Sequence, residues 1–210
     1  MRKLTFSLLI ALFTLSVANA QINKGTSMVG GSIYYNQQKT EQNNNVVNQF
    51  TKRSELGIVP SYGFAIKDNL IVGADISYTN TTYENGTNNN SNKTKNNGFG
   101  IGVFARPYRN LGSSGFYLYA QGRLGAGFSK ESSSDLKGFD IGLGINPGVA
   151  YAVTPKMHIE TGLNNLFYAG YSSSKTTNGA NTYKSSGFNA NIGLGSSTQW
   201  TVGVKFLFGS

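Results

Sequence analysis

Apolar and polar residues alternate with a period of two along most of the chain. In residues 55–64, Leu56, Ile58 and Tyr62 fall on one face of an extended chain and Glu55 falls on the other. This period is the signature of β-strands, and no later segment sustains the 3.6-residue apolar period of a helix. The alternation predicts eight strands, the last of them unbroken. They cover residues 27–35, 55–64, 70–78, 99–105, 116–128, 139–151, 157–163 and 188–208.

The connections between these strands alternate in length. The long ones are rich in Asn, Ser, Thr and Lys, and they have too few apolar residues to order themselves by burial. This arrangement predicts an all-β fold: an eight-stranded antiparallel up-and-down transmembrane β-barrel with short periplasmic turns and long extracellular loops. The short connections are 67–69, 108–114 and 154–156, and the long ones are 36–52, 80–96, 130–137 and 169–185.

Charged residues inside the predicted strands all fall on the face opposite to the apolar positions. A soluble β-sandwich would show the same separation, with the apolar face turned inward. The charged face, however, is rich in glycine, which weakens a solvent-exposed strand but leaves room inside a narrow barrel. The pattern therefore predicts apolar side chains toward lipid and charged side chains in the lumen. The predicted lumen charge network is Glu55, Asp75, Arg106, Arg123, Asp140, Glu160 and Lys205.

The depths of these charges suggest which of them pair. Counting from the short turns places Asp75, Arg123, Glu160 and Lys205 at similar depths, with Arg106 nearer the turns. An unpaired ion in a narrow lumen carries a large desolvation cost, so two acids and two bases at one level should pair and close the lumen. Glycines at neighbouring inward positions leave space for the long basic side chains.

Aromatic residues on the apolar face gather near both ends of the predicted strands. Two such girdles are typical of the interfaces of a bilayer. Tyr62, Phe64, Phe116, Tyr151, Phe206 and Phe208 lie near the short turns, and Tyr78, Phe99, Phe128, Phe139, Phe167 and Phe188 lie near the long connections.

Residues 1–20 have the features of a cleaved signal peptide. Arg2 and Lys3 precede an apolar run that is shorter than the roughly 20 residues of a membrane-spanning helix. A small-x-small cleavage site follows at residues 18–20. We therefore expect residues 21–210 to form a single barrel domain in the outer membrane of a Gram-negative bacterium.

The end of the chain fits the pattern polar-x-Gly-x-x-aromatic-x-aromatic, formed by Thr201, Gly203, Phe206 and Phe208. This pattern resembles the terminal-strand signal that the barrel-assembly machinery recognises, and the resemblance implies that machinery as a partner during biogenesis. Two residues follow the last aromatic residue, which departs from the usual pattern.

Taken whole, residues 24–208 resemble the small eight-stranded outer-membrane β-barrel family, which includes the OmpA transmembrane domain, OmpX and Opa proteins. The strand-turn-strand units at 59–70 and 146–157 resemble those of outer membrane β-barrel domains common in Bacteroidota. The resemblance implies an architecture without a single function, because the family includes adhesins, weak pores and proteins of unknown role.

The composition leaves few classes of enzyme. The chain has no cysteine and one histidine, which excludes thiolate metal sites and most imidazole-based catalytic designs. His158 falls in the lumen two positions from Glu160, where we expect a buried, hydrogen-bonded structural histidine. The alternating glycines at 98–102 lack the following helix that a phosphate-binding loop needs. We expect no catalytic residue, no metal and no cofactor.

The chain is basic, with a net charge of +9. Without residues 1–20, 16 basic residues oppose 9 acidic ones, for a net charge of +7. The basic residues form no aromatic-lined groove, so nucleic acid is not an expected partner. In the long connections, eight lysines oppose four acidic residues, and this excess favours the anionic headgroups of outer-membrane lipids. The sequence does not indicate an oligomeric state.

These features favour a non-enzymatic barrel with a structural or surface-interaction, adhesion-like role in the cell envelope. A narrow porin-like channel for small solutes or ions is the leading alternative. Eight strands enclose an interior just wide enough to be filled by side chains, which excludes a wide pore. An outer-membrane enzyme is the third alternative.

Overall fold

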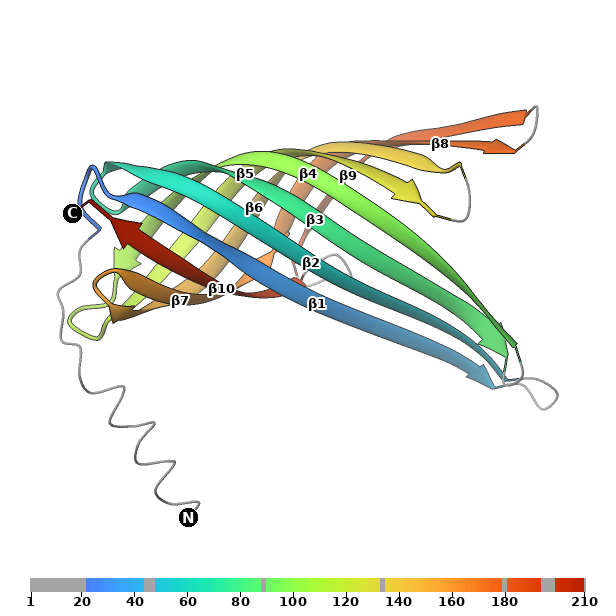
Figure 1. Cartoon of the computed structure of the whole chain (residues 1–210), viewed down its shortest axis with the longest axis horizontal. Helices are drawn as coiled ribbons and strands as arrows, with labels where there is room; N and C mark the ends of the chain where they lie inside the picture. The colour runs from blue at the N-terminus through green and yellow to red at the C-terminus, as the bar shows by residue number, and fades with distance from the viewer. Residues whose placement is uncertain are drawn as a thin grey trace, which may run out of the picture.

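The chain forms one antiparallel β-sheet that curls into a ring, as the computed structural model shows (Figure 1). The structure describes residues 22–43, 48–87, 90–132, 135–178, 181–193 and 199–209, so the expected signal peptide lies outside the described residues. Among the described residues, no helix is long and apolar enough to cross a membrane. The strands are β1 (Ser27–Asn43), β2 (Asn48–Lys67), β3 (Leu70–Thr87), β4 (Asn90–Asn110), β5 (Phe116–Glu131), β6 (Lys137–Thr154), β7 (Met157–Asn164), β8 (Phe167–Asn178), β9 (Asn181–Ile192) and β10 (Gln199–Phe208).

Eight of these strands close the ring. Strands β1 to β6 pair in sequence order, β7 pairs with β6, and β10 pairs with both β7 and β1. The closing pair of strands runs from Ser27 opposite Phe208 to Tyr34 opposite Thr201. Strands β8 and β9 form a hairpin that pairs with the other half of β6. The structure therefore confirms the eight-stranded antiparallel barrel.

The last predicted strand is divided. β9 ends at Ile192 and β10 begins at Gln199, and Gly193 between them has a positive φ of 108°. Such a φ does not occur in an extended strand, so the alternation of residue types continues where the strand does not. The prediction of one unbroken strand at 188–208 was wrong for this reason. Residues 194–198 of that predicted strand lie outside the described residues.

This division leaves the wall of the barrel incomplete in its longer half. β10 pairs with β1 only as far as Tyr34, and β9 pairs with β8. Within the described ranges, the stretch of β1 beyond Tyr34 is paired with β2 alone. The β8–β9 hairpin diverges from the β1–β2 hairpin in Figure 1.

Three of the four predicted long loops, at 36–52, 80–96 and 169–185, are largely strand. The β1–β2 ladder continues to Asn43 opposite Asn48, the β3–β4 ladder to Thr87 opposite Asn90, and the β8–β9 ladder continues to Asn178 opposite Asn181. The prediction of unordered loops was wrong because it considered only apolar burial. Main-chain hydrogen bonds between antiparallel neighbours do not depend on apolar side chains, and the threonines and tyrosines here favour strands.

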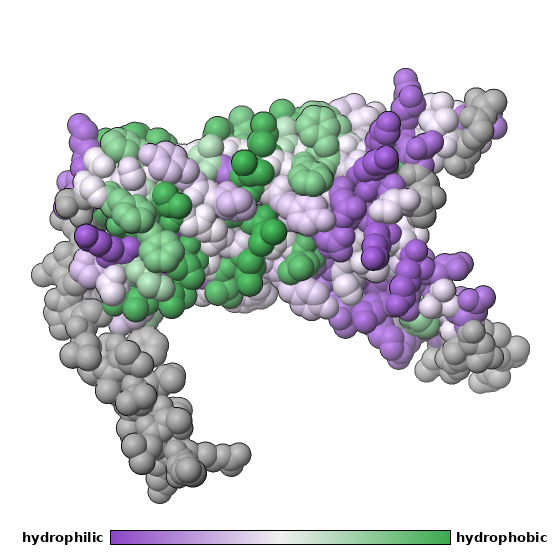
Figure 2. Space-filling view, viewed as in Figure 1, coloured by the Kyte–Doolittle hydropathy of each residue, from purple (hydrophilic) through white to green (hydrophobic). Residues whose placement is uncertain are grey.

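The two faces of the barrel have opposite chemistry. Large apolar side chains on the outside are well exposed, including Ile101 and Phe128 at 63% each. Figure 2 shows a hydrophobic band around the part of the barrel near the short turns and hydrophilic residues where the hairpins extend. An exposed apolar band of this kind is stable in lipid and would aggregate in water.

A small apolar core fills the lumen at the end that carries the short turns. Met28, Ile71 and Tyr117 are almost completely buried there. The segment before β1 lies against this end, because the Asn69 amide donates to the Ile22 carbonyl at 2.8 Å and the Ile22 side chain is buried. The lumen is therefore filled by side chains at the short-turn end.

Candidate functional site in the lumen

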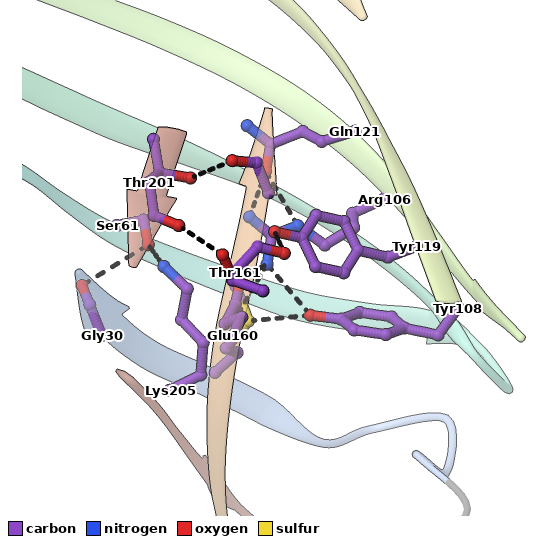
Figure 3. A network of polar contacts seen from close by, with 12 residues as sticks. Gly30, Ser61, Arg106, Tyr108, Tyr119, Gln121, Glu160, Thr161, Thr201 and Lys205 are labelled. Atoms are coloured by element: carbon purple, nitrogen blue, oxygen red, sulfur yellow. Dashed lines mark hydrogen bonds and ion pairs between the residues drawn. The ribbon is translucent and has the colours of Figure 1, made fainter. Parts of the chain in front are cut away.

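An arginine on β4 and a glutamate on β7 meet across the lumen, directly above the apolar core. Arg106 Nη1 donates to both carboxylate oxygens of Glu160, at 2.8 and 2.7 Å (Figure 3). Arg106 also donates to Gln121 Oε1 from Nε, at 2.8 Å, and from Nη2. Arg106 is 6% exposed and Glu160 is 4% exposed. The two opposite charges therefore neutralise each other within the protein, and both side chains are almost completely shielded from solvent.

Tyrosine rings enclose this ion pair. The Arg106 guanidinium carbon lies 4.5 Å from the centre of the Tyr119 ring and 5.9 Å from that of Tyr108. Arg106 Nη1 also donates to the Tyr108 hydroxyl at 3.1 Å. A guanidinium that is desolvated over aromatic rings gains cation–π attraction in addition to its ion pair. We refer to Arg106, Glu160, Gln121, Tyr108 and Tyr119 as the Arg106 layer.

The inward glycines make room for these rings. A Cβ atom added at Gly148 would lie 2.3 Å from Cζ of Tyr119, and one added at Gly162 would lie 2.6 Å from the Tyr119 hydroxyl. On the opposite wall, a Cβ at Gly57 would lie 2.1 Å from Cζ of Tyr34. The tyrosines thus lie flat over the backbone of neighbouring strands, which explains the excess of glycine on the lumen face.

Lys205 does not pair as expected. Its ammonium group donates to Ser61 Oγ at 2.8 Å, and the residue is 2% exposed. The side chain crosses Gly30 of β1, where an added Cβ would lie 2.7 Å from Lys205 Cδ. Among the described residues it forms no ion pair with a carboxylate. Of the expected two acids and two bases, Asp75 and Arg123 pair with each other, whereas Lys205 does not pair with Glu160 because Glu160 is paired with Arg106.

A second ion pair lies farther from the short turns. Arg123 on β5 donates to Asp75 on β3 from Nε at 3.0 and 2.9 Å and from Nη2 at 2.6 Å. Asp75 is buried, while the Arg123 side chain is 26% exposed. Between this pair and the Arg106 layer is a polar cavity of about 160 Å³. The inward side chains therefore form two polar layers separated by a small cavity.

We predict that a methyl group on the lumen face of β5 will disturb the second layer. In Gly125→Ala, the new Cβ would lie 2.2 Å from Nη1 of Arg123, a side chain whose Nε and Nη2 atoms donate to Asp75. Overpacking of this kind costs about 1 to 3 kcal/mol. The matched control is Gly122→Ala on the same strand, where the nearest atom is 4.0 Å from the new Cβ. Equal urea unfolding midpoints for the two variants would contradict the packing argument.

The two remaining charges of the predicted network lie toward the hairpins. Glu55 accepts hydrogen bonds from Arg53 Nη2 at 2.5 Å and from Gln199 Nε2 at 2.6 Å. Asp140 is exposed and lines a vestibule of about 330 Å³ together with Arg123. Arg53, Gln199 and the inward tyrosines are absent from the sequence prediction, which considered only charged residues within the predicted strands. Their positions alternate with the outward apolar residues, and this spacing could have predicted that they point into the lumen.

His158 is part of the core. It is 1% exposed, and its ring stacks on that of Tyr117 with centres 5.2 Å apart. Its Nε2 atom has no hydrogen-bond partner in the described part of the chain. His158 is buried, as the sequence predicted, but its Nε2 atom does not form the predicted hydrogen bond with any described residue. In the described ranges no cluster of three or more His, Cys, Asp or Glu residues could hold a metal ion.

Known structures share this architecture. No protein-family model and no curated protein sequence matches the chain. The outer membrane protein OprG from Pseudomonas aeruginosa is similar in structure, with a TM-score of 0.57 and 12% identity over 91% of this chain and 99% of that one. The fold is that of a small outer-membrane β-barrel.

Two further solved structures align at lower TM-scores. Neisserial surface protein A aligns at 0.46 with 19% identity, over 88% of this chain and 98% of its own. The outer membrane protease OmpT from Escherichia coli aligns at 0.32 with 10% identity, over 88% of this chain and 94% of its own.

The four residues of the C-terminal pattern lie on the strand that closes this outer-membrane β-barrel. Phe206 and Phe208 point outward, with exposures of 44% and 51%. Thr201 and Gly203 point inward, and a Cβ at Gly203 would lie 2.8 Å from the Gly31 carbonyl oxygen. The glycine of the pattern thus permits close approach of β10 to β1, while its aromatic residues face the lipid.

Proposed function

We propose that this outer-membrane β-barrel is a closed, non-enzymatic barrel with a structural or surface-interaction role. The observation that carries the proposal is the buried Arg106–Glu160 pair, which lies across the lumen directly above the apolar core. An eight-stranded barrel has an interior that side chains can fill, and these residues fill it at the short-turn end. The 160 Å³ cavity, which is lined by Arg106 and Arg123, and the vestibule, which is lined by Arg123 and Asp140, are on this proposal recesses above the filled end.

The hairpins supply the surface for interaction. β9 is exposed at every position from Asn181 to Ile192, and the ladders of β1–β2 and β3–β4 also extend beyond the apolar band (Figures 1 and 2). Paired strands present side chains in fixed rows, in contrast to flexible loops. Their Asn, Ser and Thr side chains both donate and accept hydrogen bonds, which suits polar partners.

The position of the histidine supports the non-enzymatic part of the proposal. His158 stacks on Tyr117 within the core, and the carboxylate of Glu160 is occupied by Arg106. A general base must reach a proton of its substrate within hydrogen-bond distance. His158 does not line the 160 Å³ cavity, and Glu160, which does line it, is held by Arg106.

Conductance distinguishes a closed barrel from the channel alternative, which the polar cavity and vestibule favour. We predict that the refolded wild-type protein shows no steady conductance in planar lipid bilayers. Arg106→Ala is expected to raise ion leakage, because it removes the side chain that spans the lumen. Arg123→Ala is the control, since the Arg106 layer stays in place below it. Steady wild-type conductance whose ion selectivity changes in Arg123→Ala would overturn the closed barrel in favour of a channel.

A further inference from the structure

Four lysines stand side by side on the outer face of the barrel. Lys130 on β5 is opposite Lys137 on β6, Lys137 is opposite Lys175 on β8, and Lys175 is opposite Lys184 on β9. Directly opposed residues share a face, with Cβ atoms about 4.5 to 5.5 Å apart. Lys130 is two positions from Phe128, and Lys137 is two positions from Phe139. Residues two positions apart on a strand point to the same face, and both phenylalanines point outward, so the two lysines point outward as well. We call Lys130, Lys137, Lys175 and Lys184 the lysine row.

Like charges directly opposite one another destabilise a sheet, so an anion bound along the row would stabilise it. None of its members forms an ion pair with a carboxylate in the described part of the chain. The other side of the barrel differs. There Lys39 and Lys52 are opposed, but Lys39 pairs with Glu41, and Glu84 lies between Lys52 and Lys93 and pairs with Lys93 at 3.4 Å. The lysine row has no such internal compensation.

A row of aromatic side chains lies next to the lysine row. Tyr78, Phe99, Phe128 and Phe139 are opposite one another on β3 to β6, two residues closer to the short turns than Lys130 and Lys137. The ring centres of Phe128 and Phe139 are 5.2 Å apart. Aromatic residues of outer-membrane barrels mark the boundary between acyl chains and headgroups. The lysines are therefore at headgroup depth.

The two rows also share a groove. Phe99, Phe128, Lys130 and Lys137 line an open recess of about 510 Å³ on the outside of the barrel, and the acidic Glu131 is also among its lining residues. Its aromatic walls are suited to an acyl chain, and its lysine edge is suited to phosphate oxygens. A soluble anion would satisfy the lysines and leave the apolar part of the groove without a partner.

We propose that the lysine row and this groove bind a phosphorylated lipid of the outer leaflet, with phosphate on the lysines and an acyl chain against Phe99 and Phe128. The anion relieves the repulsion between the opposed lysines, and the lipid is retained at one place on the barrel. This binding site is independent of whether the lumen is open or closed.

Lipid counting by native mass spectrometry tests the proposal with diphosphoryl lipid A as the probe. The folded protein in neutral detergent micelles is expected to retain this lipid and to lose it as salt rises. A basic residue near an anionic surface contributes about 1 kcal/mol, which corresponds to about fivefold in affinity. We therefore expect about fivefold weaker binding in Lys137→Gln and a far greater loss when all four lysines are replaced.

Controls separate the row from general positive charge and from free phosphate. Replacement of Lys39, Lys52 and Lys93 by Gln on the compensated side should leave lipid retention close to that of the wild type. Phe128→Ala should weaken retention of the lipid. An equal loss in both lysine variants, retention of the lipid after removal of its phosphates, or equal competition by inorganic pyrophosphate would overturn the proposal. Lys137→Gln keeps the test valid if the fourfold variant does not fold.

Discussion

Replacing Arg106 with methionine is expected to destabilise the barrel by about 3 to 5 kcal/mol. The change removes the guanidinium that donates to both oxygens of Glu160 and leaves this carboxylate, which is 4% exposed, without its ion-pair partner. Gln121 Oε1 loses its hydrogen bonds at the same time. The loss is measured as the shift in free energy of unfolding by urea, with the protein folded in lipid vesicles.

Two further variants show whether the effect comes from the stranded charge. Arg106→Met combined with Glu160→Leu removes both charges of this ion pair, and replacing both partners of a buried ion pair by apolar residues is often neutral or stabilising. This double variant should recover most of the lost stability. Lys93→Ala removes one half of a pair in which the lysine is 59% exposed, and it should change stability by about 1 kcal/mol or less. A loss in Arg106→Met no larger than that in Lys93→Ala would contradict the role of the layer.

Replacing Phe208 with alanine is expected to lower the amount of protein in the outer membrane sharply. Phe208 belongs to the pattern that resembles the assembly signal and is 51% exposed on the lipid face of β10. Its side chain has few partners within the barrel to lose, so the stability of the folded protein should change little. The recognition of the terminal strand precedes closure, so the effect should appear during assembly. Quantitative immunoblots of outer-membrane fractions measure this level.

Phe64→Ala is a closely matched control for this experiment. Ser27 of β1 is opposite Phe64 on one side and Phe208 on the other, so the two aromatic residues lie at one level of the barrel. Phe64 is 43% exposed on the same outer face but belongs to β2. If both variants reach the membrane at the same level, the effect of Phe208 is general lipid contact, and the assembly signal is refuted.

The alternation of residue types was sufficient to predict the faces of the strands. A strand places successive side chains on opposite sides. Once the apolar positions are assigned to the lipid face, Arg106 and Glu160, which alternate with them, must point into the lumen. The turns between β2 and β3 and between β6 and β7 were also close to their predicted positions, because they carry local signals: Asn69 has a positive φ of 59°, and Pro155 begins the second turn.

The extent of the strands depended on pairing, which composition does not reveal. Asn- and Thr-rich segments on β1 to β4 are ordered because each has a hairpin neighbour that satisfies its main chain along the whole ladder. At Gly193, in contrast, the predicted strand is interrupted, and β9 does not pair with β1. Both features are determined by the partner strand and by backbone conformation at single residues.

The sequence by itself determined that the chain forms a barrel with apolar residues outside and charges inside, because both properties follow from local parity. Only the tertiary structure decided which charges meet. Arg106 and Glu160 are on β4 and β7, which are not neighbours, and they approach only because the closed ring brings opposite walls together. Irregular pairing at Ala65–Lys67 and Ala152–Thr154 also shifts the depth of each later residue. Counting from the turns grouped Asp75 with Arg123, which do pair, but it missed Arg106 as the partner of Glu160. The reason is that depth in a barrel depends on the stagger of all its strands.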